Sequence, residues 1–540
     1  MVADFFVKPI SEDKSSLRSE PLKQTLQKSY KINCVEREMK TDVLIIGAGG
    51  AGLRAAIAAK EEGVDVVVLT KEYPTRSQTC MAQGGINAAL GSVSPDSIEE
   101  HIQNTLKSAH GLADEESVRF MCSEAPATVA WLDSIGVCFS RTEDAKIAQR
   151  TLGGASAPRA CYAQDYTGLK ILHTLYDEAL KHGIEIKSEK ILLELLQDES
   201  GVVCGAVILD LRSGQKESYF AKSVVLATGG YSRIYGKNST NSTKASGDGI
   251  AVAKRAGAKL LDMEFVQFHP TGLKSSSILI SESARGEGGY ILNSKGERFT
   301  NELAPRDEVS RALDREIKKG EDIFLDIRHL GETFINEGLP QERKLAKLYE
   351  NVDPVYDLIP IKPVAHYTMG GIEVDNNSQT TLEGLYACGE CSNHRVHGAN
   401  RLGGNSLLEI VVFGKEAGCN AAKRAKSMES HLMASAKDDF LEQQFSNELD
   451  FYEVREMMSD LLYNKVGIVR RESELREALA FVQDAKVKLP SMGAKDTAQR
   501  YNTNLAEFLE FRNMLDVAEF VITAALSRKE SVGAHTIEQE

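Results

Sequence analysis

Residues 41–71 constrain the fold more than any other stretch of the chain. The run Val43-Leu44-Ile45-Ile46 is short, apolar and mostly β-branched, which is typical of a strand buried on both faces of a parallel sheet. Good helix formers fill residues 51–62, Gly63 ends them, and a second apolar strand follows over residues 65–69. A strand, a helix and a second strand within thirty-one residues predict an α/β, Rossmann-like domain.

The turn between the first strand and the helix predicts a dinucleotide site. Gly47, Gly49 and Gly52 have the spacing G-x-G-x-x-G, and together with Gly50 they let backbone approach a pyrophosphate at the helix N-terminus. A tight glycine turn without a ligand is the alternative. The acidic residue that binds the ribose of nicotinamide cofactors is missing after the second strand, where Thr70 and Lys71 stand. This substitution favours FAD over NAD as the cofactor.

Composition narrows the class of protein. At 540 residues the chain is too long for a single core, and we expect three or four domains. A net charge of −14 disfavours nucleic acid and anionic lipid as direct partners. Nine scattered cysteines are an odd number, so a disulfide framework is not expected and a reducing compartment is. No apolar run has signal-peptide or membrane-span length, and residues 1–40 read as a polar N-terminal extension.

A second motif carries a resemblance to a known family. The stretch Pro74-Thr75-Arg76-Ser77-Gln78-Thr79, followed by Ala82-Gln83-Gly84-Gly85-Ile86-Asn87, resembles the flavoprotein subunits of succinate dehydrogenases and fumarate reductases. L-aspartate oxidase belongs to the same family. In many members a histidine at the position of Gln78 is joined covalently to FAD. An amide cannot form that bond, so the resemblance implies noncovalently bound FAD, a lower flavin potential and a preference for the reductive direction.

Further motifs follow in family order up to about residue 420, and the resemblance implies FAD contacts at several of them. These are Ala227-Thr228-Gly229, Asp248, Glu390 at the FAD ribose, and Asn405-Ser406-Leu407, besides Ser77, Gln78, Thr79, Gln83, Gly84 and Gly85. His397 is expected near the flavin, and His394 has no assigned role. Cys388 and Cys391 form a C-x-x-C pair, for which metal binding is the alternative, but no second cysteine pair exists and no metal is expected.

A dicarboxylate substrate must bring two charges out of water, so its site needs cationic and hydroxyl donors. The resemblance assigns this task to Arg401, His366, His269 and Ser281. It also implies that Arg306 donates a proton to the substrate and that Glu282 and Arg285 relay protons to Arg306. Leu152 stands where aspartate oxidases are expected to carry a carboxylate for the substrate ammonium, which disfavours that activity.

The resemblance implies a division of the chain. We expect an N-terminal extension over residues 1–40 and an FAD-binding domain over residues 41–272 and 365–420. An α+β capping domain is inserted over residues 273–364, and a C-terminal helical domain covers residues 421–540. Apolar residues at three- and four-residue spacing predict helices in that last domain over residues 441–463, 472–489 and 504–526.

The sequence therefore predicts the FAD-dependent flavoprotein subunit of a fumarate reductase or succinate dehydrogenase, which transfers hydride between FAD and fumarate or succinate. The resemblance implies a separate iron–sulfur subunit and a membrane-anchor or electron-donor subunit, with the protein on the cytoplasmic side of the cell membrane through these partners. L-aspartate oxidase is the alternative enzyme. A flavin-bearing assembly subunit without dicarboxylate turnover is the alternative from another class.

Overall fold

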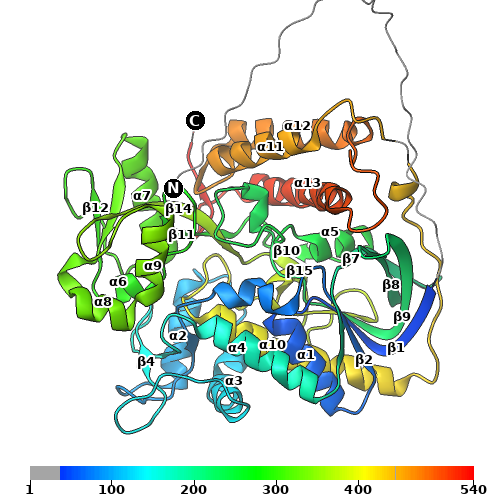
Figure 1. Cartoon of the computed structure of the whole chain (residues 1–540), viewed down its shortest axis with the longest axis horizontal. Helices are drawn as coiled ribbons and strands as arrows, with labels where there is room; N and C mark the ends of the chain where they lie inside the picture. Colours follow the sequence, from blue (N-terminus) through cyan, green and yellow to red (C-terminus); the bar gives the residue numbers. More distant parts are fainter. Residues whose placement is uncertain (1–36, 444, 540) are drawn as a thin grey trace, which may run out of the picture.

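The computed structural model describes residues 37–443 and 445–539. The extension predicted for residues 1–40 lies outside the described residues, except for residues 37–40, which begin the first strand, β1 (Arg37–Ile46). Figure 1 shows a sheet with helices against it, a smaller unit beside it and a layer of long helices above. The predicted α/β class with an inserted unit and a C-terminal helical layer is confirmed.

Within the described residues, the largest sheet has seven strands in the order β6-β2-β1-β9-β8-β7, with β16 paired to β9. β1 pairs in parallel with both β2 and β9, and the side chains of Val43, Leu44 and Ile45 are fully buried. Because β1 and β9 run in the same direction, their carboxyl ends meet at one edge, where Ala227 N donates to Ile46 O at 2.8 Å. The bounds of the strands after β1 are β2 (Val66–Leu69), β6 (Glu185–Lys187), β7 (Lys190–Gln197), β8 (Val203–Asp210), β9 (Gln215–Leu226) and β16 (Leu385–Ala387).

Helices cover the sheet on the side opposite the C-terminal helices (Figure 1). α1 (Gly50–Glu61) packs against α10 (Asn405–Ser427) so closely that a Cβ at Gly418 would lie 2.1 Å from Ala55 O. α10 continues beyond the predicted domain boundary after residue 420. The other helices on this side are α2 (Ile98–Ser108), α3 (Glu115–Ser134) and α4 (Thr167–Lys181), whereas α5 (Asp248–Arg255) packs on α13 on the other side. The short strands of the main body are β3 (Ile86–Asn87), β4 (Gln149–Arg150), β5 (Ala160–Cys161), β10 (Leu260–Leu261), β15 (Gly371–Glu373) and β17 (Ser392–Asn393).

Residues 274–358, which we name the inserted unit, leave and rejoin the main body through a pair of antiparallel strands, β11 (Val266–Leu273) and β14 (Ile359–Thr368). Apolar side chains between Leu273 and Ile361 form a core separate from the two large cores of the main body. A unit with its own core can move as a body about the two strands. Its elements are α6 (Ser283–Gly286), β12 (Tyr290–Asn293), α7 (Arg306–Lys318), β13 (Ile323–Asp326), α8 (Glu332–Gly338) and α9 (Pro340–Tyr349).

Three C-terminal helices pack together above the sheet (Figure 1). They are α11 (Phe451–Lys465), α12 (Glu472–Val487) and α13 (Thr503–Ser527), followed by the pairing of β18 (Val469–Arg470) with β19 (Thr536–Ile537). The bundle and its last two helices are confirmed. The prediction of a helix from residue 441 is wrong for its first part, because the Asp450 carboxylate accepts from Tyr452 N at 2.9 Å and caps α11 there.

Across residues 37–443 and 445–539, none of the helices combines the length and the apolar character needed to span a bilayer. In the same residues no cluster of three or more histidine, cysteine, aspartate or glutamate side chains is arranged to hold a metal ion.

Candidate active site

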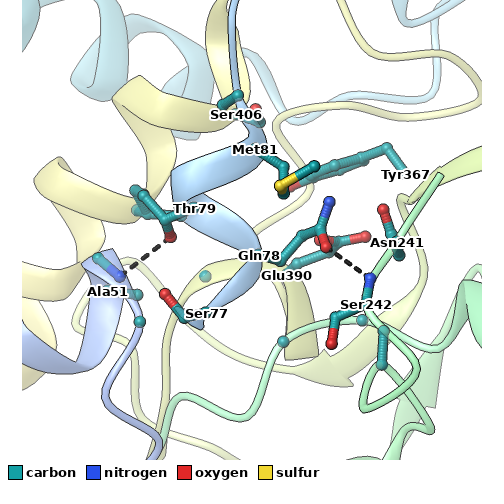
Figure 2. Close-up of a pocket in the computed structure, with 18 of the residues that line it drawn as sticks. Ala51, Ser77, Gln78, Thr79, Met81, Asn241, Ser242, Tyr367, Glu390 and Ser406 are labelled. Carbon is teal, nitrogen blue, oxygen red and sulfur yellow. Dashed lines mark hydrogen bonds between the residues drawn. The ribbon is translucent and has the colours of Figure 1, made fainter. Parts of the chain in front are cut away.

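One long pocket begins where β1 and β9 end and extends to the inserted unit. Its lining includes the glycine turn, residues 77–85, the end of β9, and charged side chains from both the main body and the inserted unit. Figure 2 shows Ser77, Gln78 and Thr79 on one side of this pocket, with Ser242, Glu390 and Tyr367 across from them. Elements far apart in the sequence therefore build one continuous site.

The glycine turn is close-packed in a way that side chains would disrupt. Gly47 has φ +115°, and a Cβ there would lie 2.1 Å from Ala227 O, while a Cβ at Gly52 would lie 1.9 Å from Gly47 O. Gly49 caps α1 without a side-chain acceptor, and the first turn carries no acidic residue. Gly50 N donates to Thr79 Oγ1 at 3.1 Å, and the rest of the first turn of α1 presents its N–H groups and a positive dipole end to the pocket, as a pyrophosphate requires.

Unpartnered polar atoms in the pocket fit a flavin dinucleotide. Ser77 Oγ, Gln83 Oε1 and Thr228 Oγ1 are buried and have no hydrogen-bond partner among the described residues. Buried polar groups are rarely left unpaired, so these atoms indicate a bound polar ligand. Gln78 Oε1 accepts a hydrogen bond from Ser242 N at 2.8 Å, drawn dashed in Figure 2. This bond links residues 77–85 to the segment after β9.

Charged groups close the end of the pocket near β2. Lys71 Nζ lies 2.6 Å from Asp248 Oδ2 and 3.1 Å from Glu510 Oε1, and Lys244 also contacts Glu510. Burial lowers the pKa of Lys71, but the two carboxylates outweigh it and raise the pKa above its ordinary value. Glu510 belongs to α13, so the C-terminal helices contribute to this pocket through Lys71.

Glu390 lies on the pocket wall, where Thr368 N donates to its Oε1 at 2.9 Å. Burial raises the pKa of Glu390 to about 7 in spite of that hydrogen bond. A carboxyl group that changes charge near neutral pH is well matched to the hydroxyl groups of a ribose, which it can accept from when ionised.

Where the main body meets the inserted unit, a buried chain of charges crosses the pocket wall. Arg306 Nη2 lies 2.5 Å from Glu282 Oε2, and Arg285 Nη2 lies 3.2 Å from Glu282 Oε1. Burial would raise the pKa of Glu282, but the two guanidinium groups lower it to about 2. Glu282 therefore stays ionised between the two guanidinium groups and holds both of them in place by charge.

Sequence reasoning missed Gln267, which joins the two arginines of the site. Its Oε1 accepts from Arg306 Nη1 at 2.9 Å and from Arg401 Nη2 at 3.0 Å. The Gln267 amide is fully buried, and its Nε2 donates to Asn400 and to Arg401 O. The available signal was a polar residue in the apolar strand β11, two positions before His269 and so on the same face.

Arg401 lies beside a second buried network. Its guanidinium carbon is 4.4 Å from the ring centre of Tyr367, and burial lowers the pKa of Arg401 to about 10. The Tyr367 hydroxyl donates to Glu409, which also lies 3.1 Å from His397 Nε2. His397 therefore lies behind Tyr367 and outside the pocket lining.

The two histidines of the site are neutral donors rather than cations. His269 and His366 stack edge to face with ring centres 4.9 Å apart. Burial and then the charge of Arg306 lower the pKa of each imidazole well below its ordinary value. His269 Nδ1 accepts from Thr271 N at 3.3 Å, which leaves its proton on Nε2. The site therefore combines the charged guanidinium groups of Arg306 and Arg401 with the neutral imidazoles of His269 and His366.

Most residues proposed from the sequence line the pocket. Lining positions from the cofactor set are Gly47, Gly49, Gly50, Thr70, Lys71, Ser77, Gln78, Thr79, Gln83, Gly84, Gly85, Ala227, Thr228, Gly229, Asp248, Glu390, Ser406 and Leu407. Those from the substrate set are His269, Ser281, Glu282, Arg306, His366 and Arg401. Three residues lie behind the lining: Gly52 packs on Gly47, Asn405 bonds Asn87 and His101, and Arg285 bonds Glu282.

The two cysteines of the C-x-x-C pair are buried. The Cys391 thiol donates to Leu226 O at 3.3 Å, and burial raises the pKa of Cys388 well above its ordinary value. His394 stacks on Phe413 with ring centres 3.8 Å apart and bonds Ser378, so it is part of the core. These residues serve packing around the strand end that holds Glu390.

Comparisons with known proteins agree on one family. Residues 42–407 match the FAD binding domain family, and residues 455–539 match the family described as fumarate reductase flavoprotein C-term. The chain is 39% identical to a succinate dehydrogenase flavoprotein subunit of Rickettsia bellii, covering 92% of this chain and 90% of that protein. It is 38% identical to a fumarate reductase flavoprotein subunit of Mycobacterium tuberculosis, and the match covers 92% of this chain and 91% of that protein. The FrdA chain in a solved structure of a point variant of Escherichia coli quinol fumarate reductase superposes with a TM-score of 0.87 at 36% identity. This match covers 93% of this chain and 92% of that chain.

Proposed function

We infer the function from one premise: the chain belongs to the family of flavoprotein subunits of succinate dehydrogenases and fumarate reductases. It is an FAD-dependent oxidoreductase of that family, and L-aspartate oxidase is not favoured. We propose that it works in the reductive direction, from fumarate to succinate. The observation that carries the proposal is the group of buried Arg306, Glu282, Arg401 and His269, with the half-buried His366, on the wall of one pocket that begins at the glycine turn.

The proposed cofactor residues are those of the glycine turn, residues 77–85, the β9 end and Glu390. FAD bound there supplies the hydride for one olefinic carbon of fumarate. Gln78 is in the position of the family's flavin-linked histidine, and we propose that FAD is held without a covalent bond. Acid precipitation of the holoprotein is expected to release all flavin into the supernatant, since no bond survives unfolding. Yellow colour remaining in the washed pellet contradicts this.

The substrate carboxylates are proposed to bind Arg401, His366, His269 and Ser281. Arg401 Nε is buried and has no partner among the described residues, so it is available to a carboxylate. The neutral imidazoles donate hydrogen bonds without adding buried charge. Each hydrogen bond to a charged group contributes roughly 1.5–3 kcal/mol, which offsets the cost of removing the dianion from water.

Reduction also needs one proton on the carbon next to the one that receives hydride. Arg306 is proposed to donate it, and Glu282 and Arg285 to return a proton to Arg306. Arginine is a weak acid with a pKa above about 12, so donation needs a site without bulk water and a base that holds the next proton. We propose that the inserted unit acts as the lid that excludes this water, within the predicted capping boundaries of residues 273–364.

The direct test is fumarate reduction with a reduced viologen dye. Arg306→Ala is expected to lower kcat by at least about 100-fold, because it removes the proton donor. Arg315→Ala, an exposed residue on the same helix, is expected to keep wild-type activity. Flavin content measured in both variants controls for folding. Wild-type turnover of fumarate by Arg306→Ala contradicts the mechanism, and turnover of L-aspartate with oxygen contradicts the substrate assignment.

The relatives are named as subunits, and we propose that this chain likewise works with an iron–sulfur subunit and an anchor or electron-donor subunit. Membrane association through those partners, on the cytoplasmic face, is part of the same proposal. Purification from native membranes followed by iron analysis tests it.

A further inference from the structure

Two fully buried carboxyl groups meet across the junction between the main body and the inserted unit. Asp165 lies in the loop before α4 of the main body, and Glu342 is the third residue of α9 in the inserted unit. Asp165 Oδ2 accepts from Gln341 N at 2.7 Å. The N-cap residue of α9, Leu339, offers no side-chain acceptor, so an acidic residue from the other unit caps this helix.

The remaining oxygens of the pair imply a shared proton. Asp165 Oδ1 and Glu342 Oε2 are buried without a hydrogen-bond donor among the described residues, and the two carboxyl groups contact each other. Two carboxylates are acceptors only, and buried like charges in contact are strongly unfavourable. One proton between them satisfies both oxygens. The Gln341 N–H already bonds Asp165 Oδ2, and we place the shared proton on Glu342, the carboxyl group whose pKa burial raises.

Among the described residues, neither Asp165 nor Glu342 has a salt-bridge partner that could replace that proton. The Arg150 guanidinium is the facing positive group, but it donates to the carbonyls of Gly84, Gln83 and Gln164 and lies 4.4 Å from the ring centre of Tyr162. The other titratable groups that face the pair are Tyr166 beside Asp165 and Glu287 across Arg150. Burial and then the hydrogen bond with Asp165 raise the pKa of Glu342 well above its ordinary value.

The pair also reaches the substrate site. Ser281 N donates to Glu342 Oε1 at 3.3 Å, and Ser281 is on the pocket lining where we propose a substrate carboxylate binds. We propose that Asp165 and Glu342 form a proton-sharing latch that docks α9 on the main body, closes the inserted unit over the site and positions Ser281. Both are positioning residues, because neither lines the pocket. The docking of α9 is independent of the proposed function, whereas the effect of Ser281 on substrate binding rests on it.

The latch makes closure depend on pH. A carboxyl group with a raised pKa in the docked state stabilises docking fully below its ordinary pKa, and this contribution is lost as pH rises toward the raised value. Between the ordinary and the raised pKa of Glu342, the equilibrium constant for docking therefore falls by up to about tenfold for each pH unit. Above the raised pKa it no longer changes with pH. Glu342→Gln replaces the shared proton by an amide N–H, which keeps the hydrogen bond and removes the titration.

The test measures hydrogen exchange of the holoprotein over residues 278–287 and α9 from pH 5 to 9, corrected for intrinsic exchange rates. Wild-type protection is expected to fall as pH rises, and Glu342→Gln is expected to remain protected at every pH. Glu342→Ala is expected to be weakly protected throughout. Glu337→Gln, an exposed lid glutamate on α8, is the matched control and should follow the wild type. Protection of Glu342→Gln that falls with pH as in the wild type overturns the latch, as does wild-type protection in Glu342→Ala.

Fumarate binding to the oxidised holoprotein, followed by flavin absorbance, supplies the second measurement. The wild-type Kd is expected to rise with pH and the Glu342→Gln Kd to stay at its low-pH value. If no variant binds fumarate while exchange follows the expected pattern, the latch stands and the proposed substrate fails. A Kd that changes equally with pH in wild type and Glu342→Gln refutes the link to Ser281.

Discussion

At the scale of single residues, the site is organised by how a few polar side chains compensate buried charge. Glu282 forms ion pairs with both Arg306 and Arg285, whereas Arg401 has no carboxylate within ion-pair distance among the described residues. The charge of Arg401 is instead offset by the face of Tyr367 and the amide oxygen of Gln267. This leaves one strongly electropositive point in the pocket, which suits a substrate carboxylate.

The amide of Gln267 offers a test at this scale. Gln267→Ala removes one acceptor shared by Arg306 and Arg401, and both guanidinium groups lose their fixed orientation. We expect kcat/KM for fumarate to fall roughly 10- to 100-fold, because a buried hydrogen bond to a charged group contributes about 1.5–3 kcal/mol. Gln197→Ala is the control, since Gln197 bonds two carbonyls far from the pocket. An unchanged kcat/KM in Gln267→Ala, at normal flavin content, contradicts the role.

At the scale of elements, the junction of β1 and α1 decides whether the cofactor pocket forms. The helix comes so near its own turn that Gly52 touches Gly47 O, and β9 passes equally close at Ala227. Such spacing leaves no room for a methyl group, and packed backbone cannot yield as a flexible side chain does. The glycines therefore shape the turn, and apart from Gly50 N, which donates to Thr79 Oγ1, the N–H groups of the first turn of α1 are left for the ligand.

Gly52→Ala is expected to destabilise the holoprotein by about 1–3 kcal/mol, because its Cβ forces α1 away from the turn. Flavin content after purification should fall with it. Gly338→Ala in α8 has only ordinary contacts, with Phe334 at 3.5 Å, and is expected to leave both quantities unchanged. Thermal unfolding and flavin absorbance measure the two effects. Wild-type flavin content in Gly52→Ala contradicts this account of the turn.

At the scale of the whole molecule, three parts meet at one pocket: the inserted unit has its own core, and the C-terminal helices share a core with the sheet. The main body holds the glycine turn, the inserted unit supplies Glu282 and Arg306, and the C-terminal helices reach it through Glu510. Lys71 and Glu510 are 439 residues apart in the sequence and yet form a buried ion pair. Cofactor retention is therefore tied to the docking of the C-terminal helices on the sheet.

Removing the charge of Glu510 tests whether FAD retention depends on the docking of the C-terminal helices. In Glu510→Gln, Lys71 keeps Asp248 as its ion-pair partner and Ser246 as a hydrogen-bond acceptor but loses its second carboxylate, and the buried end of the pocket is less well organised. We expect FAD to dissociate about tenfold faster, the effect of roughly 1.4 kcal/mol at one charge-assisted contact. Glu507→Gln, on the same helix and paired with the half-exposed Arg455, should release FAD at the wild-type rate. Release is followed by the rise in flavin fluorescence on dilution, and equal rates in both variants contradict the coupling.

The sequence by itself determined the β–α–β unit, the cofactor class and the helices α12 and α13, because these depend on residues that are neighbours along the chain. Glycine spacing, apolar periodicity and capping act within a few residues and are visible as patterns. Family motifs extended this to Arg306, Arg401 and the two histidines. The pattern failed at residue 441, where apolar side chains belong to an irregular segment and the Asp450 cap decides the start of α11.

Only the tertiary structure decided the contacts between distant segments. Gln267 is one polar residue in a strand until folding places Arg306 and Arg401 against its oxygen. Asp165 and Glu342 are ordinary carboxyl groups until burial removes water from both and sets them in contact. The neutral state of His269 and His366 has the same origin, since burial and the arginine charges arise together on folding. Periodicity along a chain holds no information about which side chains will share a low-dielectric interior, and that sharing sets charge, proton position and the chemistry of the site.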